Sequence, residues 1–375
     1  MLTELGPREL SDALTCVRHS FALSPLVMTV DACLASIHSD GAIIRDSDPP
    51  TRFVRDVIAV YSECLTPDAL ERLQAIPVFC HDAPLCNAVA RRSSSGDPFV
   101  LFYSGLLAVA KYRQSLAILA SNLEYMLEQK SNDLPRAKRA LSDLIAPAQA
   151  LSYWYYVTPL RLPEFDGIFC NPHKDQLTHG LGCAIMYVTL HEIGHVILGH
   201  LDDRHAPPPQ IAANYVDEDI GTWKMMEFAA DAFAISGIKP TLKLSFITSV
   251  FIILDLISDI ECFCLPRSGT HPYVVNRVNN LACALGLEND KFYAQRTYSL
   301  LSQKKALLEE RAKFFPAVSH EDPEKQAAIA VDAFKKSLPA KEECLFALDT
   351  LKSMYDGVDY LGPHTEAEYA AQNSN

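Results

Sequence analysis

The sequence predicts a predominantly helical α+β fold. Apolar residues recur at helical spacing along most of the 375-residue chain. Only residues 77–103 contain the short apolar and aromatic runs, separated by a polar turn, that are typical of strands. Hydrophobic residues make up 49% of the chain, which is sufficient for a substantial core. We therefore expect a small sheet surrounded by added helices.

The chain divides into three predicted regions. An N-terminal helical region covers residues 1–76, with two helices over residues 8–38, a third over 53–65 and a fourth that begins at Pro67. Thr66 is the expected N-cap of this fourth helix, because proline is favoured at the first helical position. Residues 77–288 form the predicted core region. Residues 289–375 form a C-terminal helical region, with helices over 300–315, 322–337 and 340–355.

The strand-forming stretch begins the core region. Residues 77–80 form one short predicted strand, and residues 87–90 and 99–103 form a hairpin across a polar turn. One hypothesis is an edge strand that pairs with an extended substrate, formed by Phe99, Val100, Leu101, Phe102 and Tyr103. The alternative is a structural hairpin without a role in chemistry.

A helical insertion at about residues 108–180 follows the hairpin. Its aromatic-rich stretch, residues 151–157, favours a packed contact over a ligand cage. This insertion is a candidate surface for a regulatory protein partner.

The motif H-E-x-x-H follows, formed by His191, Glu192 and His195 within a predicted helix at residues 181–201. Positions four apart lie on the same face of a helix, so the two imidazoles can bind one metal ion. Glu192 would lie beside the open coordination position and accept a proton from metal-bound water. The flanking residues are apolar, which indicates a buried helix whose polar side chains need partners. A core helix with unrelated histidines is the alternative.

The third ligand is not found immediately after the motif. The metzincin spacing requires a glycine at position 198 and a histidine at 201, but the chain has Leu198 and Leu201. His200 would lie nearly opposite His191 on a continuous helix, so it could join the same metal only if the helix broke.

Glu227 is the predicted third ligand. It completes the two-histidine, one-glutamate set of thermolysin-type catalytic zinc, with water in the fourth position. Asp231, one helical turn further on, can accept a hydrogen bond from a ligand histidine. Between them, Ala229 and Ala230 are small enough to let two helices approach closely. We therefore predict one Zn²⁺ per chain.

The net charge of the chain disfavours two classes of binding partner. The net charge of −13 and the pI of about 5.4 disfavour nonspecific binding to nucleic acid or to an anionic membrane.

The eleven cysteines are scattered without a C-x-x-C pair, which indicates reduced thiols in the cytoplasm. The N-terminus lacks the pattern of a signal peptide. The apolar run from Phe246 to Leu256 is interrupted by Asp255 and is too short for a membrane span, so we expect a buried helix.

His271 and Arg277 are further candidates for the site. Together they could stabilise the oxyanion of a tetrahedral intermediate beside a metal-bound carbonyl. Their spacing alone favours ordinary roles, with His271 as a helix cap and Arg277 in a surface ion pair.

The separated motifs resemble the gluzincin metallopeptidases that include the CAAX prenyl endopeptidases, the HtpX proteases and the Oma-type peptidases. The matching segments are residues 87–88 with 100–107, His191 to His200, Glu227 with Ala230-Asp231, and Thr270-His271-Pro272 with Arg277. The resemblance covers roughly residues 85–285. It implies a zincin-like core with an active-site helix and a short edge-strand hairpin, and it implies that His271 and Arg277 lie near the catalytic centre.

The chain departs from this family in the connection before the metal helix. The family has a short connection after the segment that corresponds to Gly105-Leu106-Leu107, whereas about seventy residues intervene here. We interpret them as the helical insertion, which could cover the cleft. The motif region is also similar to the ImmA/IrrE-like proteases and to the Lit-type phage-exclusion peptidases, and both resemblances imply the same ligands.

The sequence thus predicts a cytoplasmic zinc endopeptidase that hydrolyses a protein or peptide substrate. Glu192, His271 and Arg277 are the predicted catalytic residues. The alternative is a non-catalytic or latent zinc protein that regulates or binds another protein, for example in a stress or phage-defence system. In that case a fourth protein ligand, such as His200 or a cysteine, would close the metal site.

Overall fold

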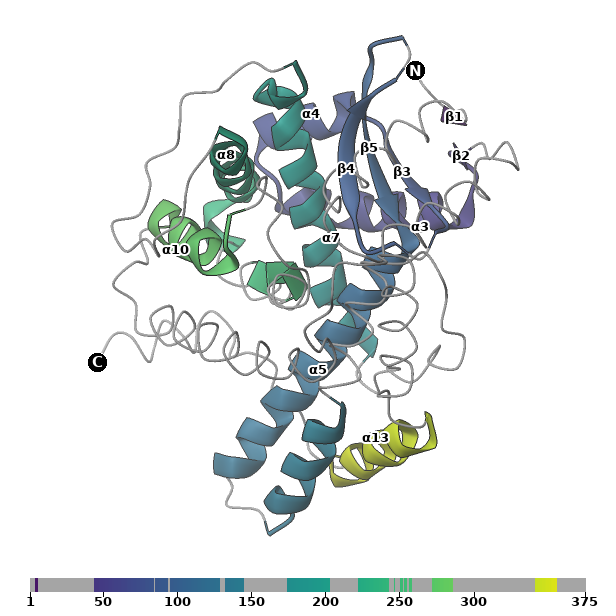
Figure 1. The fold of residues 1–375 in the computed structure, drawn as a ribbon, viewed down its shortest axis with the longest axis vertical. Helices are drawn as coiled ribbons and strands as arrows, with labels where there is room; N and C mark the ends of the chain where they lie inside the picture. Colours follow the sequence, from purple (N-terminus) through teal and green to yellow (C-terminus); the bar gives the residue numbers. More distant parts are fainter. Residues whose placement is uncertain are drawn as a thin grey trace, which may run out of the picture.

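The structure, a computed structural model, is mostly helical with a small mixed sheet (Figure 1). It describes residues 4–5, 44–83, 85–93, 95–128, 132–144, 174–202, 222–242, 246, 250–251, 253–254, 256–257, 272–285 and 341–355. The α+β class is therefore confirmed. The helices predicted over residues 8–38, 300–315 and 322–337 and the aromatic-rich stretch 151–157 lie outside the described residues.

The described elements run in the following order. They are β1 (Glu4–Leu5), β2 (Ile44–Arg45), α3 (Pro49–Tyr61), η1 (Ser62–Cys64), α4 (Pro67–Ala75), β3 (Val78–His81), β4 (Ala88–Arg92), β5 (Pro98–Tyr103), α5 (Ser104–Glu128), α7 (Lys174–Ile197), η3 (His200–Asp202), α8 (Thr222–Ser236), η4 (Pro240–Leu242), α10 (Val274–Ala284) and α13 (Lys341–Tyr355). Residues 134–144 form a further helix between α5 and α7.

A local signal in the sequence predicts the start of α4 correctly. The backbone N–H of Ala69 donates to the Thr66 side chain at 3.4 Å, which confirms Thr66 as the N-cap of α4. Helix α3 begins at Pro49, four residues before the predicted start at residue 53. Proline lacks an N–H that the first helical turn could not bond anyway, so Pro49 and Pro50 fit there.

Helix α7 begins at Lys174, earlier than the predicted start at residue 181. Gly180 and Gly182 lie inside this helix. The Gln114 side chain of α5 occupies the space beside Gly180, and the ring of Tyr61 occupies the space beside Gly182. Tertiary packing therefore overrides the weak helix propensity of these two positions.

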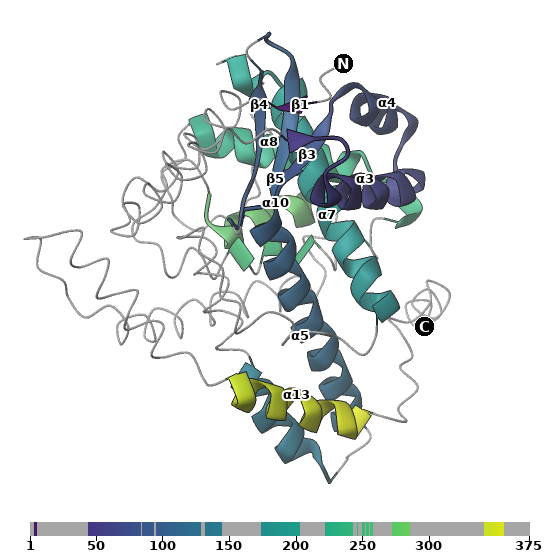
Figure 2. The ribbon, with the colours of Figure 1, turned by 90° about the vertical axis from the view of Figure 1, so that its right-hand side faces the viewer.

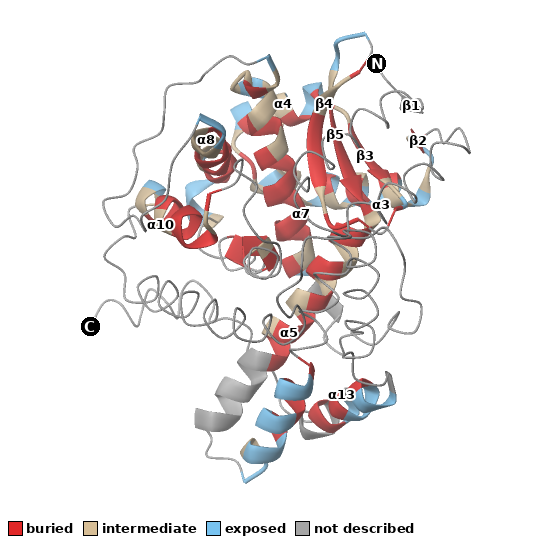
Figure 3. Cartoon of the chain, viewed as in Figure 1, coloured by how far each residue is buried: buried red, intermediate tan, exposed pale blue. Residues whose placement is uncertain are grey.

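The sheet has the strand order β3-β5-β4, with β3 parallel and β4 antiparallel to β5. The prediction of an edge strand at Phe99, Val100, Leu101, Phe102 and Tyr103 is therefore wrong, because β5 is the central strand. All five side chains are fully buried (Figure 3). A continuous apolar run of this kind is typical of a strand that is covered on both faces.

Helix α3 covers the outer edge of β3. The Thr51 hydroxyl accepts from the backbone N–H of Cys80 at 3.0 Å and donates to the Cys80 carbonyl at 3.1 Å. The Arg55 guanidinium donates to the Val78 carbonyl at 2.8 Å. These contacts satisfy the outward backbone groups of β3, which would otherwise expose a free edge. Within the described residues, β4 pairs with β5 alone, so its other edge has no strand partner; this open edge faces α7 and η3.

Helix α7 lies at the centre of the structure and packs against α3, α5, α8 and β4 (Figures 1 and 2). Its closest approach is to α8. A Cβ atom at Gly194 would lie 3.2 Å from the Cα of Ala230 and 3.2 Å from the Phe233 ring. The small residues Gly194 and Ala230 thus allow the backbones of α7 and α8 to come close together. This close approach was predicted from Ala229 and Ala230.

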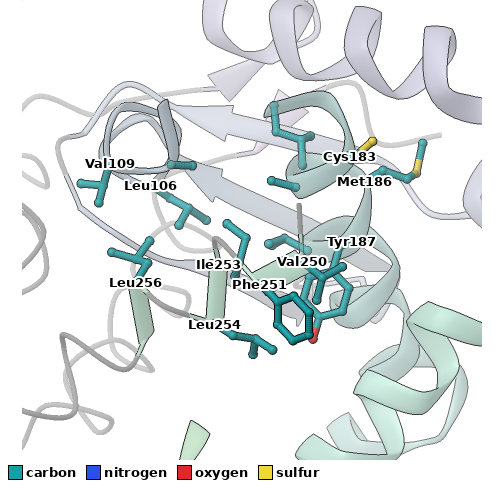
Figure 4. Close-up of a cluster of buried hydrophobic side chains, with 14 of the residues drawn as sticks. Leu106, Val109, Cys183, Met186, Tyr187, Val250, Phe251, Ile253, Leu254 and Leu256 are labelled. Atoms are coloured by element: carbon teal, nitrogen blue, oxygen red, sulfur yellow. The ribbon is translucent and has the colours of Figure 1, made fainter. Parts of the chain in front are cut away.

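The buried helix predicted over Phe246 to Leu256 is confirmed for the residues described there. Its side chains pack near α5 and α7, as Figure 4 shows for Val250, Phe251, Ile253, Leu254 and Leu256 beside Leu106, Val109 and Tyr187. Among the described helices, α7 contains a stretch, His179–Ile197, that is long and apolar enough to cross a membrane. That stretch is mostly buried in this core, as expected for the central helix of a folded domain.

The described part of the insertion extends away from the sheet. Helix α5 runs the length of this extension, and the helix at 134–144 returns beside it, next to α13 (Figures 1 and 2). Ala140, Leu141 and Leu144 pack in the same apolar cluster as Cys344, Ala347 and Leu351. Helix α13 (Lys341–Tyr355) therefore lies where a C-terminal helix is predicted over residues 340–355, and it shares apolar packing with the extension.

Candidate metal centre

Two imidazoles and one carboxylate converge between α7 and α8. The Nε2 atoms of His191 and His195 are 3.2 Å apart, because the two residues lie one turn apart on α7. Helix α8 brings Glu227 against them, with Oε2 at 3.3 Å from Nε2 of His191 and Oε1 at 3.5 Å from Nε2 of His195. The three donor atoms lie within 4.8 Å of one another and could hold a metal ion. The predicted ligands thus meet at one point.

A second layer of polar side chains surrounds Asp231, which is fully buried. Oδ1 of Asp231 lies 2.9 Å from Nδ1 of His191 and accepts a hydrogen bond from the Tyr187 hydroxyl at 2.6 Å. The Arg277 guanidinium donates to both carboxylate oxygens, at 2.7 and 2.8 Å. This arrangement places Asp231 behind a ligand histidine, where a carboxylate fixes the orientation and tautomer of the ring.

Arg277 comes from α10 and is 3% exposed. The alternative of a surface ion pair is therefore wrong. Its Nη1 atom lies 3.8 Å from Oε2 of Glu227, so one cation lies between the ligand carboxylate and Asp231. The guanidinium is engaged with these two carboxylates, and its predicted action on an oxyanion stays a prediction. His271 lies outside the described residues.

The protein groups around His191 favour a proton on its imidazole. Burial lowers the pKa of His191, but hydrogen bonds and charges from Asp231 and Glu227 outweigh burial and raise this pKa to about 10. Burial raises the pKa of Asp231, whereas the Arg277 charge and His191 hold it well below its usual range. A metal ion would take the place of the proton on Nε2, which faces Glu227, whereas the proton on Nδ1, which faces Asp231, would remain.

Glu192 lies on the side of α7 that faces the open edge of the sheet. Its carboxylate accepts a hydrogen bond from the backbone of Ala90 in β4. Burial and the nearby Glu227 charge raise the pKa of Glu192, His191 and the Ala90 hydrogen bond lower it, and the net pKa is about 7. A carboxylate with this pKa is suited to accept and return a proton near neutral pH.

The helix break after α7 was not foreseen. Helix α7 ends at Ile197, and Gly199 adopts a φ of 75°, which ends the helix because other residues are strained there. His200 therefore turns back and places its Nδ1 2.9 Å from Nδ1 of His195. Gly199 was the signal in the sequence. Tyr187 was also missed, although it lies one helical turn before His191 on the same face.

The described residues supply three ligands, with no cysteine in the group. Comparisons of the chain with models of known protein families, with curated proteins and with solved structures found no match. The geometry of the site therefore carries the functional argument.

Proposed function

We propose that this protein is a zinc-dependent endopeptidase with a zincin-like core. This proposal depends on one observation: His191, His195 and Glu227 meet beside Glu192, next to the open edge of β4. Zinc bound tetrahedrally to nitrogen and oxygen donors at about 2.0–2.1 Å keeps those donors about 3.3 Å apart. The separations of 3.2, 3.3 and 3.5 Å match this value.

The donor set favours a catalytic over a structural zinc. Structural zinc sites are closed by four protein ligands, whereas catalytic sites keep one position for water. The closest additional imidazole described, His200, contacts Nδ1 of His195 and so lies behind the ligand rather than beside the metal position. A fourth position facing Glu192 and β4 is consistent with hydrolysis.

Bound zinc would supply a water molecule acidified towards a pKa of about 7 and would polarise the scissile carbonyl. The rest of the chemistry belongs to the chain. Glu192 lies where it would accept a proton from water and return it to the leaving amine. Glu227, His191 and His195 would hold the metal, and the Arg277 charge keeps the pKa of Asp231 low, so that this carboxylate stays charged.

The open edge of β4 is suited to bind an extended peptide by adding a strand to the sheet. Ala90 lies at the middle of β4, and its backbone touches the Glu192 carboxylate, so a peptide on this edge would pass the catalytic base. This assignment replaces the predicted role of residues 99–103. The resemblance to gluzincin peptidases and a cytoplasmic location are part of the same proposal.

The test is cleavage of an unfolded protein mixture by the purified chain, followed by mass spectrometry of the new peptide ends. We expect cleavage that is lost after dialysis against a zinc chelator and restored by one equivalent of zinc. A His191→Ala chain treated identically is the control for a contaminating protease. Zinc binding without any cleavage would instead favour the non-catalytic zinc protein.

A further inference from the structure

The turn that follows α7 carries a buried histidine whose role the peptidase proposal does not use. His200 opens η3 and is 5% exposed. Its Nδ1 lies 2.9 Å from Nδ1 of His195, and its Nε2 is buried without a hydrogen bond to the described residues. Among the described residues, the His200 ring therefore makes its polar contact through Nδ1, with His195.

The placement of protons follows from the direction of the metal ligands. Nε2 of His195 faces Nε2 of His191 and the Glu227 carboxylate, so Nε2 is the nitrogen that would bind the metal. A neutral imidazole with an unprotonated Nε2 carries its proton on Nδ1. That N–H points at His200, which must offer an unprotonated Nδ1 and keep its own proton on Nε2.

The Nδ1 atoms of the two proposed ligand histidines have different hydrogen-bond partners. Nδ1 of His191 faces the Asp231 carboxylate, whereas Nδ1 of His195 faces the neutral ring of His200. Metal-bound histidines usually donate their second N–H to such a partner, and its removal lowers metal affinity.

An ion pair fixes the turn that presents His200. Arg92, at the end of β4, donates from Nη2 and Nε to the Asp202 carboxylate at 2.6 and 2.9 Å. The Arg92 Nη1 atom also donates to the Gly96 carbonyl at 2.9 Å. Because Asp202 is the last residue of η3, this pair holds the turn against the hairpin of the sheet.

We propose that His200 is a positioning residue, which accepts the Nδ1 hydrogen of His195 and so fixes the tautomer and ring orientation with which His195 binds the metal. This inference rests on the proposed metal site but concerns a residue that the reaction itself does not require. Its predicted effect is on metal affinity before any effect on the chemical step.

Three variants separate the hydrogen bond from packing. His200→Leu fills most of the space without an acceptor, His200→Ala empties it, and His200→Asn restores an oxygen near the position of Nδ1. We expect the zinc dissociation constant, measured by competition with a chromophoric chelator, to rise about 10- to 100-fold in the Leu and Ala variants. The Asn variant should stay within about threefold of wild type. The visible spectrum of the cobalt-substituted chain should change clearly in the Leu and Ala variants and little in the Asn variant.

The matched control is His179→Ala, which removes an exposed histidine of α7 whose ring contacts Tyr61 and Cys183. It should leave the zinc dissociation constant unchanged. Wild-type affinity and spectrum in the Leu and Ala variants, or an Asn variant as weak as the Leu variant, would refute the role of His200.

A measurement on the unaltered chain removes any dependence on variant folding. Nitrogen-15 correlation spectra of the zinc-bound protein should show His200 neutral with its proton on Nε2. A proton on Nδ1 of His200 would contradict the proposal. Wild-type chain that binds no zinc would refute the metal site as well, whereas zinc-dependent cleavage with unaffected His200 variants would refute this inference alone.

Discussion

Replacing Glu192 with glutamine is expected to leave the metal in place and to remove nearly all peptidase activity. Glutamine has the same shape and can still approach β4, but it cannot accept the proton from water or return it to the leaving amine. Loss of a general base lowers the rate by about 10²- to 10⁴-fold. Glu192 is not one of the converging metal ligands, so the zinc content should remain that of wild type.

The comparison uses kcat/KM for one cleavage site, together with zinc per chain by elemental analysis. Glu71→Gln, an exposed glutamate on α4, is the matched control and should retain full activity. A zinc-replete Glu192→Gln chain that cleaves at the wild-type rate would remove Glu192 from the mechanism.

Replacing Asp231 with asparagine is expected to cause the largest loss of stability. The change keeps the volume of the side chain but leaves the Arg277 charge buried without its main partner. Removing one member of a buried ion pair costs about 3–5 kcal/mol. We expect this decrease in the free energy of unfolding of the metal-free chain, measured by urea denaturation.

The exposed pair of Asp68 and Arg72 on α4 provides the control. Their side chains are 2.9 Å apart, as close as the buried pair, but Asp68 is 71% exposed. Asp68→Asn should therefore cost less than about 1 kcal/mol. The double variant Asp231→Asn/Arg277→Met should recover part of the loss, because no uncompensated charge remains. Equal effects of the buried and exposed substitutions would contradict this account.

The ion pair of Asp231 and Arg277 also determines how the stability of the folded chain changes with pH. The pKa of Asp231 is lower in the folded than in the unfolded chain, so its stabilisation is fully present above the unfolded value of about 4. The stabilisation is lost as the pH falls through the lower, folded pKa. In Asp231→Asn this acid-dependent contribution should be absent.

The convergence of His191, His195 and Glu227 could be predicted because the spacing of these residues along the chain determines which helix face each one occupies. The interval between His191 and His195 fixes a shared helix face, and the i+4 spacing of Glu227 and Asp231 places both carboxylates on one face of α8. That Glu227 meets His191 and His195 across the interface of α7 and α8 could be inferred because a zinc site with two histidines needs a further donor, and few residue types can provide one.

Strand order and the helix break were harder to predict. The sequence of β5 shows that both its faces are buried, but which strand pairs on its other side depends on β3, which lies about twenty residues earlier. His200 was placed on a continuous helix, although Gly199 allows a positive φ that reverses its direction. Both errors came from tertiary geometry that one-dimensional periodicity does not contain.

The most direct test of the central claim is X-ray absorption at the zinc edge, combined with elemental analysis of the purified chain. The account predicts one zinc per chain, with two imidazole ligands and oxygen donors at about 2.0–2.2 Å. His191→Ala should lose the bound zinc. A chain without zinc after metal-replete purification, or zinc with sulfur ligands at about 2.3 Å, would contradict the assignment of His191, His195 and Glu227 as an open catalytic site.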